Sequence, residues 1–140
     1  MLKPAKHLTF FFLFFILNCS PRIARFNETA YQNAINLKIE SLRLMDNAVD
    51  SIGSHIKEVS DLEMKIEKAH QYVMWLPRNE LTVKQWEVLM KPDGGLLGEF
   101  LSRWKEEKVL NKGYVKASKI LVEQAFNEII KLETGKVKPQ

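Results

Sequence analysis

A long stretch without proline, from Arg22 to Leu76, constrains the fold of this chain more than any other feature. Apolar residues recur through it at steps of three, four and seven, the spacing of one face of an α-helix. A glycine inside a helix costs about 1 kcal/mol relative to alanine. We therefore expect two long helices with a break near Gly53 and Ser54. The predicted apolar stripe comprises Tyr31, Ile35, Leu42, Met45, Val49, Ile52, Ile56, Val59, Leu62, Ile66, Ala69 and Val73.

Leu37, Ile39 and Leu44 lie off this stripe and predict that the first helix is buried on more than one side. Asn27 is well placed to cap that helix, because its side chain can accept a backbone hydrogen bond. The alternating charges of residues 57–68 predict a solvent-exposed face, with ion pairs such as the one between Asp61 and Lys65.

Pro77 interrupts the helical pattern and predicts a loop, because proline lacks a backbone donor and restricts the residue before it. Beyond this loop, Thr82 and Gln85 have the spacing of a capping box. Leu81 and Trp86 have the spacing of a hydrophobic staple. The sequence therefore predicts that a short helix begins with Thr82 as its N-cap.

Residues 91–94 read Lys-Pro-Asp-Gly and predict a turn that ends this short helix. Gly94, Gly95 and Gly98 lack the lysine and hydroxyl residues of a phosphate-binding loop, so we assign them to this turn alone. The next helix should end near Lys108, with an i,i+4 pair between Glu99 and Arg103. Its predicted buried face comprises Leu96, Leu97, Phe100, Leu101 and Trp104.

A final helix is predicted over residues 114–133, with Gly135 as its C-terminal cap. No pair of strands with turn residues between them occurs, so the predicted fold is all-α: a small bundle of four to five helices over residues 27–135. Residues 136–140 form a predicted C-terminal tail. The predicted buried face of the final helix comprises Val115, Leu121, Val122, Ala125, Phe126, Ile129 and Leu132.

The first 18 residues have the pattern of a secretory signal peptide. Lys3, Lys6 and His7 precede residues 8–17, which are apolar except for one threonine. Ten residues of helix rise about 15 Å, roughly half of the hydrocarbon layer, which disfavours a permanent transmembrane helix. We expect residues 1–18 to be the signal and residues 19–26 to be a short tether.

Ile16, Leu17, Asn18, Cys19 and Ser20 resemble the lipobox of bacterial lipoproteins. The resemblance covers this segment alone, and Asn18 stands where the family usually has Gly, Ala or Ser. It implies that Cys19 is acylated and becomes the mature N-terminus, and Ser20 after it favours the outer membrane. The alternative is an ordinary signal or anchor segment in which the cysteine is incidental.

Charge and cysteine content argue against several classes of function. Of 21 basic residues, Lys3 and Lys6 lie in the predicted signal, which leaves 19 basic against 17 acidic residues. This near balance argues against nucleic-acid binding, which requires a clustered basic face. Cys19 is the one cysteine, so no internal disulfide can form.

Glu67 and His70 form one Glu-x-x-His half of a carboxylate-bridged di-iron site, which requires a second half. His55 does not supply it, because Ile52 stands where a glutamate is needed. We therefore expect no metal and place Glu67 and His70 on the solvent side of their helix. No Gly-x-Ser-x-Gly motif is present, and we predict no cofactor and no enzymatic activity.

The predicted staple accounts for Trp86, the apolar stripe for Trp104 and the end of its helix for Trp75. Trp75, beside Pro77 and Arg78, is the least explained of the three, so Trp75 and Arg78 are the predicted interaction surface. The predicted function is that of a non-catalytic, membrane-anchored envelope lipoprotein that acts as an interaction or scaffold module. Its expected partners are membrane lipid, through acylated Cys19, and an envelope protein.

Two alternatives remain open from the sequence. The first is a lipoprotein carrier that holds a small apolar ligand between its helices, motivated by the off-stripe apolar residues and the many aromatic side chains. The second is a small cell-wall enzyme, whose carboxylates would include Glu67, Glu99 and Glu123.

Overall fold

The computed structural model describes residues 24–136 as five α-helices and two short 3-10 helices, so the predicted all-α bundle is confirmed. The predicted signal peptide, Cys19 and residues 137–140 lie outside the described part of the chain. None of the described helices is long and apolar enough to cross a membrane. The elements are α1 (Glu28–Asp46), η1 (Asn47–Val49), η2 (Ile52–Ser54), α2 (Ile56–Met74), α3 (Glu80–Met90), α4 (Leu97–Glu107) and α5 (Lys112–Thr134).

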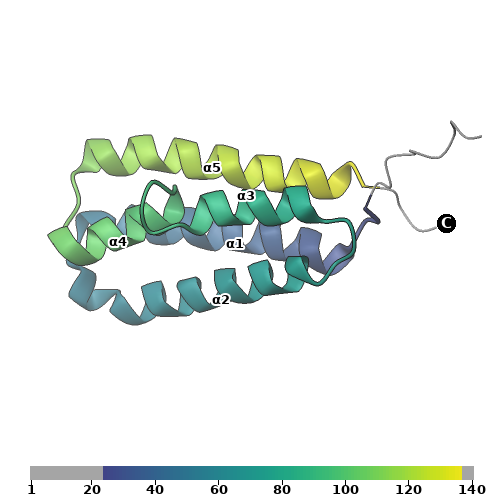
Figure 1. The fold of residues 1–140 in the computed structure, drawn as a ribbon. Helices are drawn as coiled ribbons and strands as arrows, with labels where there is room; N and C mark the ends of the chain where they lie inside the picture. The colour runs from purple at the N-terminus through teal and green to yellow at the C-terminus, as the bar shows by residue number, and fades with distance from the viewer. Residues whose placement is uncertain (1–23, 137–140) are drawn as a thin grey trace, which may run out of the picture.

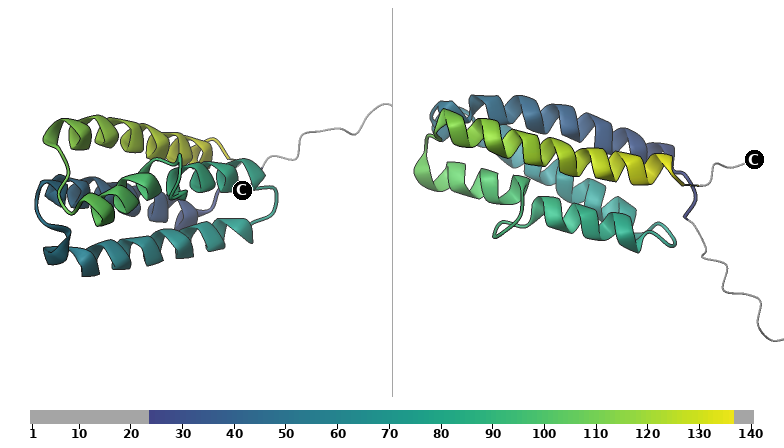
Figure 2. Two further views of the ribbon diagram at one scale, coloured as in Figure 1. Left: turned by 60° about the vertical axis from the view of Figure 1, so that its left-hand side comes forward. Right: turned by 90° about the horizontal axis from the view of Figure 1, so that it is seen from above.

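The helices form a four-column bundle in which neighbouring columns run in opposite directions (Figure 1). α1 packs against α2 and α5, and α3 packs against α2 and α5 on the other side. α3 and α4 lie one after the other along the third column, separated by a loop (Figure 2). The fold is therefore an up-down-up-down bundle whose third helix is broken in two.

The predicted break between the first two helices is confirmed, and backbone hydrogen bonds hold it in place. η1 and η2 occupy the corner around Gly53. The amide of Ile52 donates to the carbonyl of Lys108 over 2.9 Å, and the amide of Leu110 donates to the carbonyl of Ala48 over 2.7 Å. The α1–α2 corner is thus fastened to the α4–α5 loop at one end of the bundle.

Large aromatic side chains fill the core along the bundle. Trp86 and Phe126 meet edge to face with ring centroids 5.9 Å apart, and neither side chain has exposed surface. Phe100 and Trp104 are equally buried, and the Trp104 indole donates to the carbonyl of Asp50 over 3.1 Å. The predicted buried face of α4 is confirmed from Leu97 to Trp104.

The predicted buried face of α1 is only partly correct. Met45 of the stripe and the off-stripe Leu37 and Leu44 are buried as predicted. Tyr31, Ile35 and Leu42 are half-buried, whereas Ile39 and Val49 are exposed. Small side chains share the core-facing side of α1 with larger ones, and α1 packs against both α2 and α5. The observed buried face comprises Ala30, Ala34, Leu37, Ser41, Leu44 and Met45.

α3 begins at Glu80, so the prediction of Thr82 as the N-cap is wrong. Leu81 is 57% exposed while Trp86 is fully buried, which is contrary to the predicted staple. The reason is a hydrogen bond across the loop: Nδ2 of the Asn79 side chain donates to the carbonyl of Val73 over 2.9 Å and thereby fixes where the loop turns into α3.

Several details of the charged and apolar faces also differ from the predictions. Arg103 pairs with Glu107 over 2.6 Å rather than with Glu99. Asp61 pairs with Lys57 over 2.7 Å, and that hydrogen bond lowers the pKa of the Asp61 carboxyl. Lys65 reaches Glu40 of α1 over 2.5 Å. On α5, Leu121 is exposed, which is contrary to the prediction, whereas the other residues of the predicted face are buried or half-buried. Gly135 ends the helix as predicted.

Glycines determine the break between α3 and α4. A Cβ atom on Gly95 would lie 2.1 Å from the carbonyl oxygen of Lys91, and one on Gly98 would lie 2.1 Å from that of Met90. Gly94 has a φ of 67°, in the left-handed region that favours glycine. The predicted turn is confirmed, and α4 can begin close beside the end of α3 only because these side chains are absent.

Candidate interaction sites

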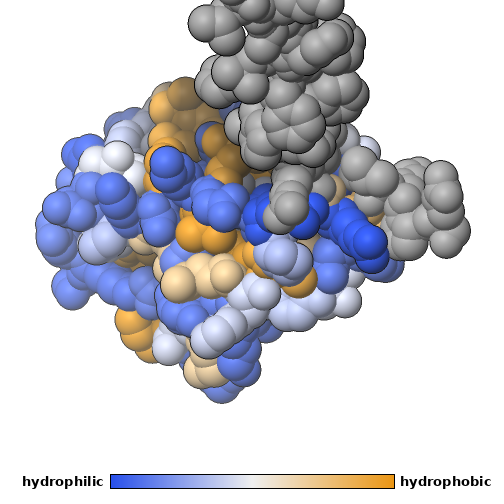
Figure 3. Space-filling model, turned by 45° about the vertical axis from the view of Figure 1, so that its right-hand side comes forward, coloured by the Kyte–Doolittle hydropathy of each residue, from blue (hydrophilic) through white to orange (hydrophobic). Residues whose placement is uncertain are grey.

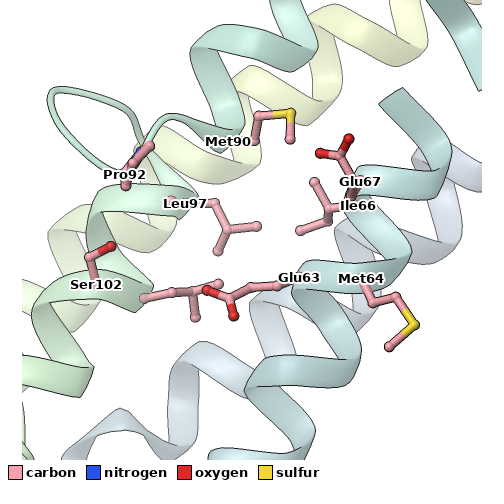
Figure 4. A pocket seen from close by; sticks show the side chains of 10 residues that line it. Glu63, Met64, Ile66, Glu67, Met90, Pro92, Leu97 and Ser102 are labelled. Atoms are coloured by element: carbon pink, nitrogen blue, oxygen red, sulfur yellow. The ribbon is translucent and has the colours of Figure 1, made fainter. Parts of the chain in front are cut away.

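The break in the third column leaves a groove of about 410 Å³ between α2 and the α3–α4 junction. Ile66 and Leu97 point toward each other across it, and Met90 closes one side (Figure 4). We call this site the flank groove; it is lined by Glu63, Met64, Ile66, Glu67, Met90, Pro92, Leu97, Gly98, Leu101 and Ser102.

The flank groove has an apolar floor and an acidic edge. Ile66, Leu97 and Leu101 are buried, while Met64 is 52% exposed. Glu63 pairs with Lys105 over 2.5 Å, and Glu67 accepts a hydrogen bond from Gln71 over 2.8 Å. Methionine side chains adapt to partners of different shape because they are unbranched and polarizable. This combination suits an apolar surface or ligand of modest size that carries a cationic group at one side.

His70 is buried, so the prediction that it faces solvent is wrong, whereas Glu67 is exposed as predicted. Neither ring nitrogen of His70 has a hydrogen-bond partner within residues 24–136. In the same part of the chain, no three His, Cys, Asp or Glu side chains are grouped so that they could hold a metal ion. The two residues of the Glu-x-x-His pattern therefore have different environments.

The three tryptophans differ sharply in exposure. Trp86 and Trp104 are fully buried, whereas Trp75 is 85% exposed, at the C-terminal end of α2. The backbone of Trp75 is held in place because its amide donates to the carbonyl of Tyr72 over 3.3 Å. Arg78 follows in the same loop with a φ of 61°, a backbone conformation uncommon for residues other than glycine. The predicted interaction residues thus lie together in the α2–α3 loop.

This loop belongs to the end of the bundle at which the described chain begins. α1 starts, α2 ends, α3 starts and α5 ends there (Figure 1). We call it the entry end. Tyr72 donates a hydrogen bond of 3.1 Å to the side chain of Asn27, which joins the end of α2 to the start of α1. The side of the molecule that includes this end shows apolar patches between hydrophilic side chains (Figure 3).

A second groove, of about 550 Å³, lies at the entry end. Ala24, at the start of the described chain, lines it together with Arg78 and Leu81 from the region where α3 begins. Leu132 and Lys131 from the last turns of α5 form the opposite wall. The N-terminal segment therefore reaches α1 beside the loop that carries Trp75 and Arg78.

A buried polar cluster at the entry end was not predicted. Glu133 has no exposed surface and Lys136 is 9% exposed. The ammonium of Lys136 donates to the carboxylate of Glu133 and to the side-chain oxygen of Asn79. The spacing of Glu133 and Lys136 was visible in the sequence, but charged residues near a helix end are ordinarily exposed. Their burial depends on the α2–α3 loop that covers them.

The three carboxylates considered for an enzyme lie on three different helices. Glu67 of α2 lines the flank groove, and Glu123 of α5 pairs with Lys38 of α1 over 3.1 Å. Glu99 lies in the first turn of α4.

Comparisons of the chain with protein-family models, with curated proteins and with solved structures gave no match.

Proposed function

We propose that this protein is a lipid-anchored, non-catalytic interaction module of a bacterial cell envelope. Acyl chains on Cys19 tether it to the membrane, with the outer membrane favoured, and the bundle contacts an envelope protein through the flank groove. Two or more chains are needed for a lasting tether, since one acyl chain alone binds only reversibly at about 0.8 kcal/mol per buried methylene.

The observation that carries the proposal is the separation of the two sites along the bundle. The described chain begins at the entry end, whereas the flank groove lies along the side of the bundle, where α3 gives way to α4 (Figure 1). An anchor that holds the entry end at a membrane therefore leaves the groove open to a second protein. A site at the entry end would face the lipid instead.

Metabolic labelling with a fatty acid tests the tether. Wild-type protein should carry the label and Cys19→Ser should lose it, because the serine hydroxyl is not a substrate for thiol acylation. Ser20→Ala is the matched control and should stay labelled. Labelling of Cys19→Ser, or no labelling of the wild type, would show that Cys19 does not carry the anchor.

Site-specific crosslinking tests the groove. A photoreactive amino acid at Met64, which is 52% exposed beside the groove, should capture one envelope protein in living cells. The same amino acid at Ile39, which is 62% exposed on α1, is the matched control and should not capture it. Equal capture from both positions would mean that the groove is not the contact surface.

The dimensions of the flank groove favour one second candidate, a carrier of a small apolar ligand. Ligand sites commonly have volumes of about 300–1,000 Å³ and mainly apolar walls, and the groove falls within that range. The fully buried Trp86 and Phe126 fill the bundle centre, so the ligand would sit in the groove rather than on the bundle axis. Native mass spectrometry of the purified protein tests this candidate, and a mass equal to that of the acylated polypeptide alone would end it.

A further inference from the structure

We propose that the entry end docks onto the lipid headgroup layer and that Trp75 inserts into it as a second membrane contact beside the acyl anchor. The docking surface, which we call the tryptophan tip, comprises Met74, Trp75, Arg78 and Leu81. This inference rests on the proposed tether and adds the orientation of the anchored bundle.

The exposure of the tip is the first step of the argument. Trp75 is 85% exposed, Leu81 57% and Met74 50%. Trp75 and Leu76 both donate backbone hydrogen bonds into the last turn of α2, so the indole projects from a fixed backbone rather than from a loose loop. An indole combines a large apolar ring with one polar N–H group, and tryptophan is enriched where a membrane meets water.

The position of the tip relative to the anchor is the second step. Cys19 precedes Ala24 by five residues, and an extended chain of that length spans at most about 18 Å. Ala24 itself lines the same groove as Arg78 and Leu81. The hydrogen bond from Tyr72 to Asn27 holds the start of α1 beside the C-terminal end of α2, which Trp75 directly follows. An anchor at Cys19 therefore keeps the tip within reach of the bilayer.

The choice of lipid over a protein partner follows from this tether. A short linker makes the encounter between the tip and the membrane intramolecular, with an effective concentration on the order of millimolar. Weak insertion of one indole is then sufficient to orient the bundle. A protein partner at the same place would have to displace the tip from a surface that it meets continuously.

Charge predicts how the docking should respond to salt. Within residues 24–136, cationic and anionic side chains near the entry end balance, so attraction between net charges in this part of the chain contributes little. The docking should therefore change little between low and high ionic strength, unlike that of a polybasic segment. The cationic residues are Arg25, Arg78 and Lys131, and the anionic residues are Glu28, Glu80 and Glu128.

Tryptophan fluorescence of the full-length protein, purified from the envelope and reconstituted into phosphatidylcholine vesicles, tests the inference. Part of the lipid carries bromine on the acyl-chain carbons closest to the headgroups, which quenches indoles that lie at the boundary between headgroups and hydrocarbon. Trp75 should be the indole that is quenched, because Trp86 and Trp104 are fully buried. The emission lost to quenching in the wild type should therefore match the emission lost in Trp75→Ser. Ile120→Ser, at a residue 51% exposed on α5, is the control and should leave the quenching unchanged.

Fatty-acid labelling of the same preparation separates the two proposals. A labelled protein with quenched Trp75 supports both, and a labelled protein whose Trp75 emission is unaffected overturns the docking while the tether stands. An unlabelled protein with quenched Trp75 overturns the tether and supports the lipid contact. An unlabelled and unquenched protein overturns both. Loss of quenching at high salt would contradict the apolar character of the contact.

Discussion

The hydroxyl of Tyr72 on α2 donates a hydrogen bond of 3.1 Å to Oδ1 of Asn27, the same oxygen that accepts the amide of Ala30 at the start of α1. One side-chain oxygen therefore caps a helix and joins it to its neighbour. This arrangement fixes the direction from which the chain enters the bundle, and with it the relation between the N-terminal segment and Trp75.

Removal of Oδ1 of Asn27 should lower the free energy of unfolding more than removal of the Tyr72 hydroxyl. Asn27→Ala loses both contacts and should lower the free energy of unfolding by about 1–2 kcal/mol. Tyr72→Phe loses one partly exposed hydrogen bond and should cost about 0.5 kcal/mol. Urea denaturation measures both, and the two effects should not add in the double variant. Simple additivity would mean that the two contacts are independent.

Lys136 should be important for stability although it lies near the end of the described chain. Lys136→Met leaves the fully buried carboxylate of Glu133 without its cation, which should cost about 3–5 kcal/mol. The double change Glu133→Leu with Lys136→Met should recover most of that loss, because it removes both charges. Thermal or urea unfolding followed by circular dichroism measures the effect.

Lys131→Met is the matched control for that experiment. Its ammonium lies 3.9 Å from Glu128, and both side chains are largely exposed. Exposed pairs contribute at most about 1 kcal/mol. A similar loss for Lys131→Met and Lys136→Met would show that the Glu133–Lys136 pair is exposed in solution.

Gly98→Ala should destabilise the bundle and distort the flank groove. The added methyl group would lie 2.1 Å from the carbonyl oxygen of Met90, so α4 must move away from the end of α3. Such overpacking costs about 1–3 kcal/mol. Denaturant unfolding measures the loss, and crosslinking from Met64 should fall in parallel. Gly53→Ala, whose nearest neighbour would be 3.6 Å away, should have little effect.

Met64→Glu should weaken partner binding without loss of stability. Met64 is half exposed beside Glu63 and Glu67, so a third carboxylate replaces an adaptable apolar contact with like charge. The free energy of unfolding should change by less than about 0.5 kcal/mol. Crosslinking from a photoreactive residue at Ser102 should fall about tenfold, the equivalent of about 1.4 kcal/mol in binding. Unchanged crosslinking would remove Met64 from the contact.

The sequence was most informative where one residue type dictates local structure. Pro77 and Gly53 mark breaks that the structure confirms, and Trp104 and Phe100 define the buried face of α4. It was misleading along α1, because a pattern built from large apolar residues ignores Ala34 and Ser41, which face the core where helices approach closely.

The candidate sites were predicted only in part. Trp75 was identified because the helical pattern explained it least among the three tryptophans, and the structure places it in the open. The start of α3 was misplaced because the side chain of Asn79 bonds to Val73, in the preceding helix, and to Lys136, far along the chain, and neither bond is visible in the local sequence of α3. The flank groove depends on the space between α2 and two short helices, and that space has no counterpart in local sequence.

The position of the entry end also determines how far the rest of the bundle stands above the membrane surface. α2 has 19 residues and rises about 28 Å along its axis. If the tryptophan tip rests on a membrane, the corner formed by η1 and η2 stands about that far above the surface, and the flank groove lies between the two levels. A partner must then extend upward from the same membrane, or downward from the opposite side, to meet the groove at that level.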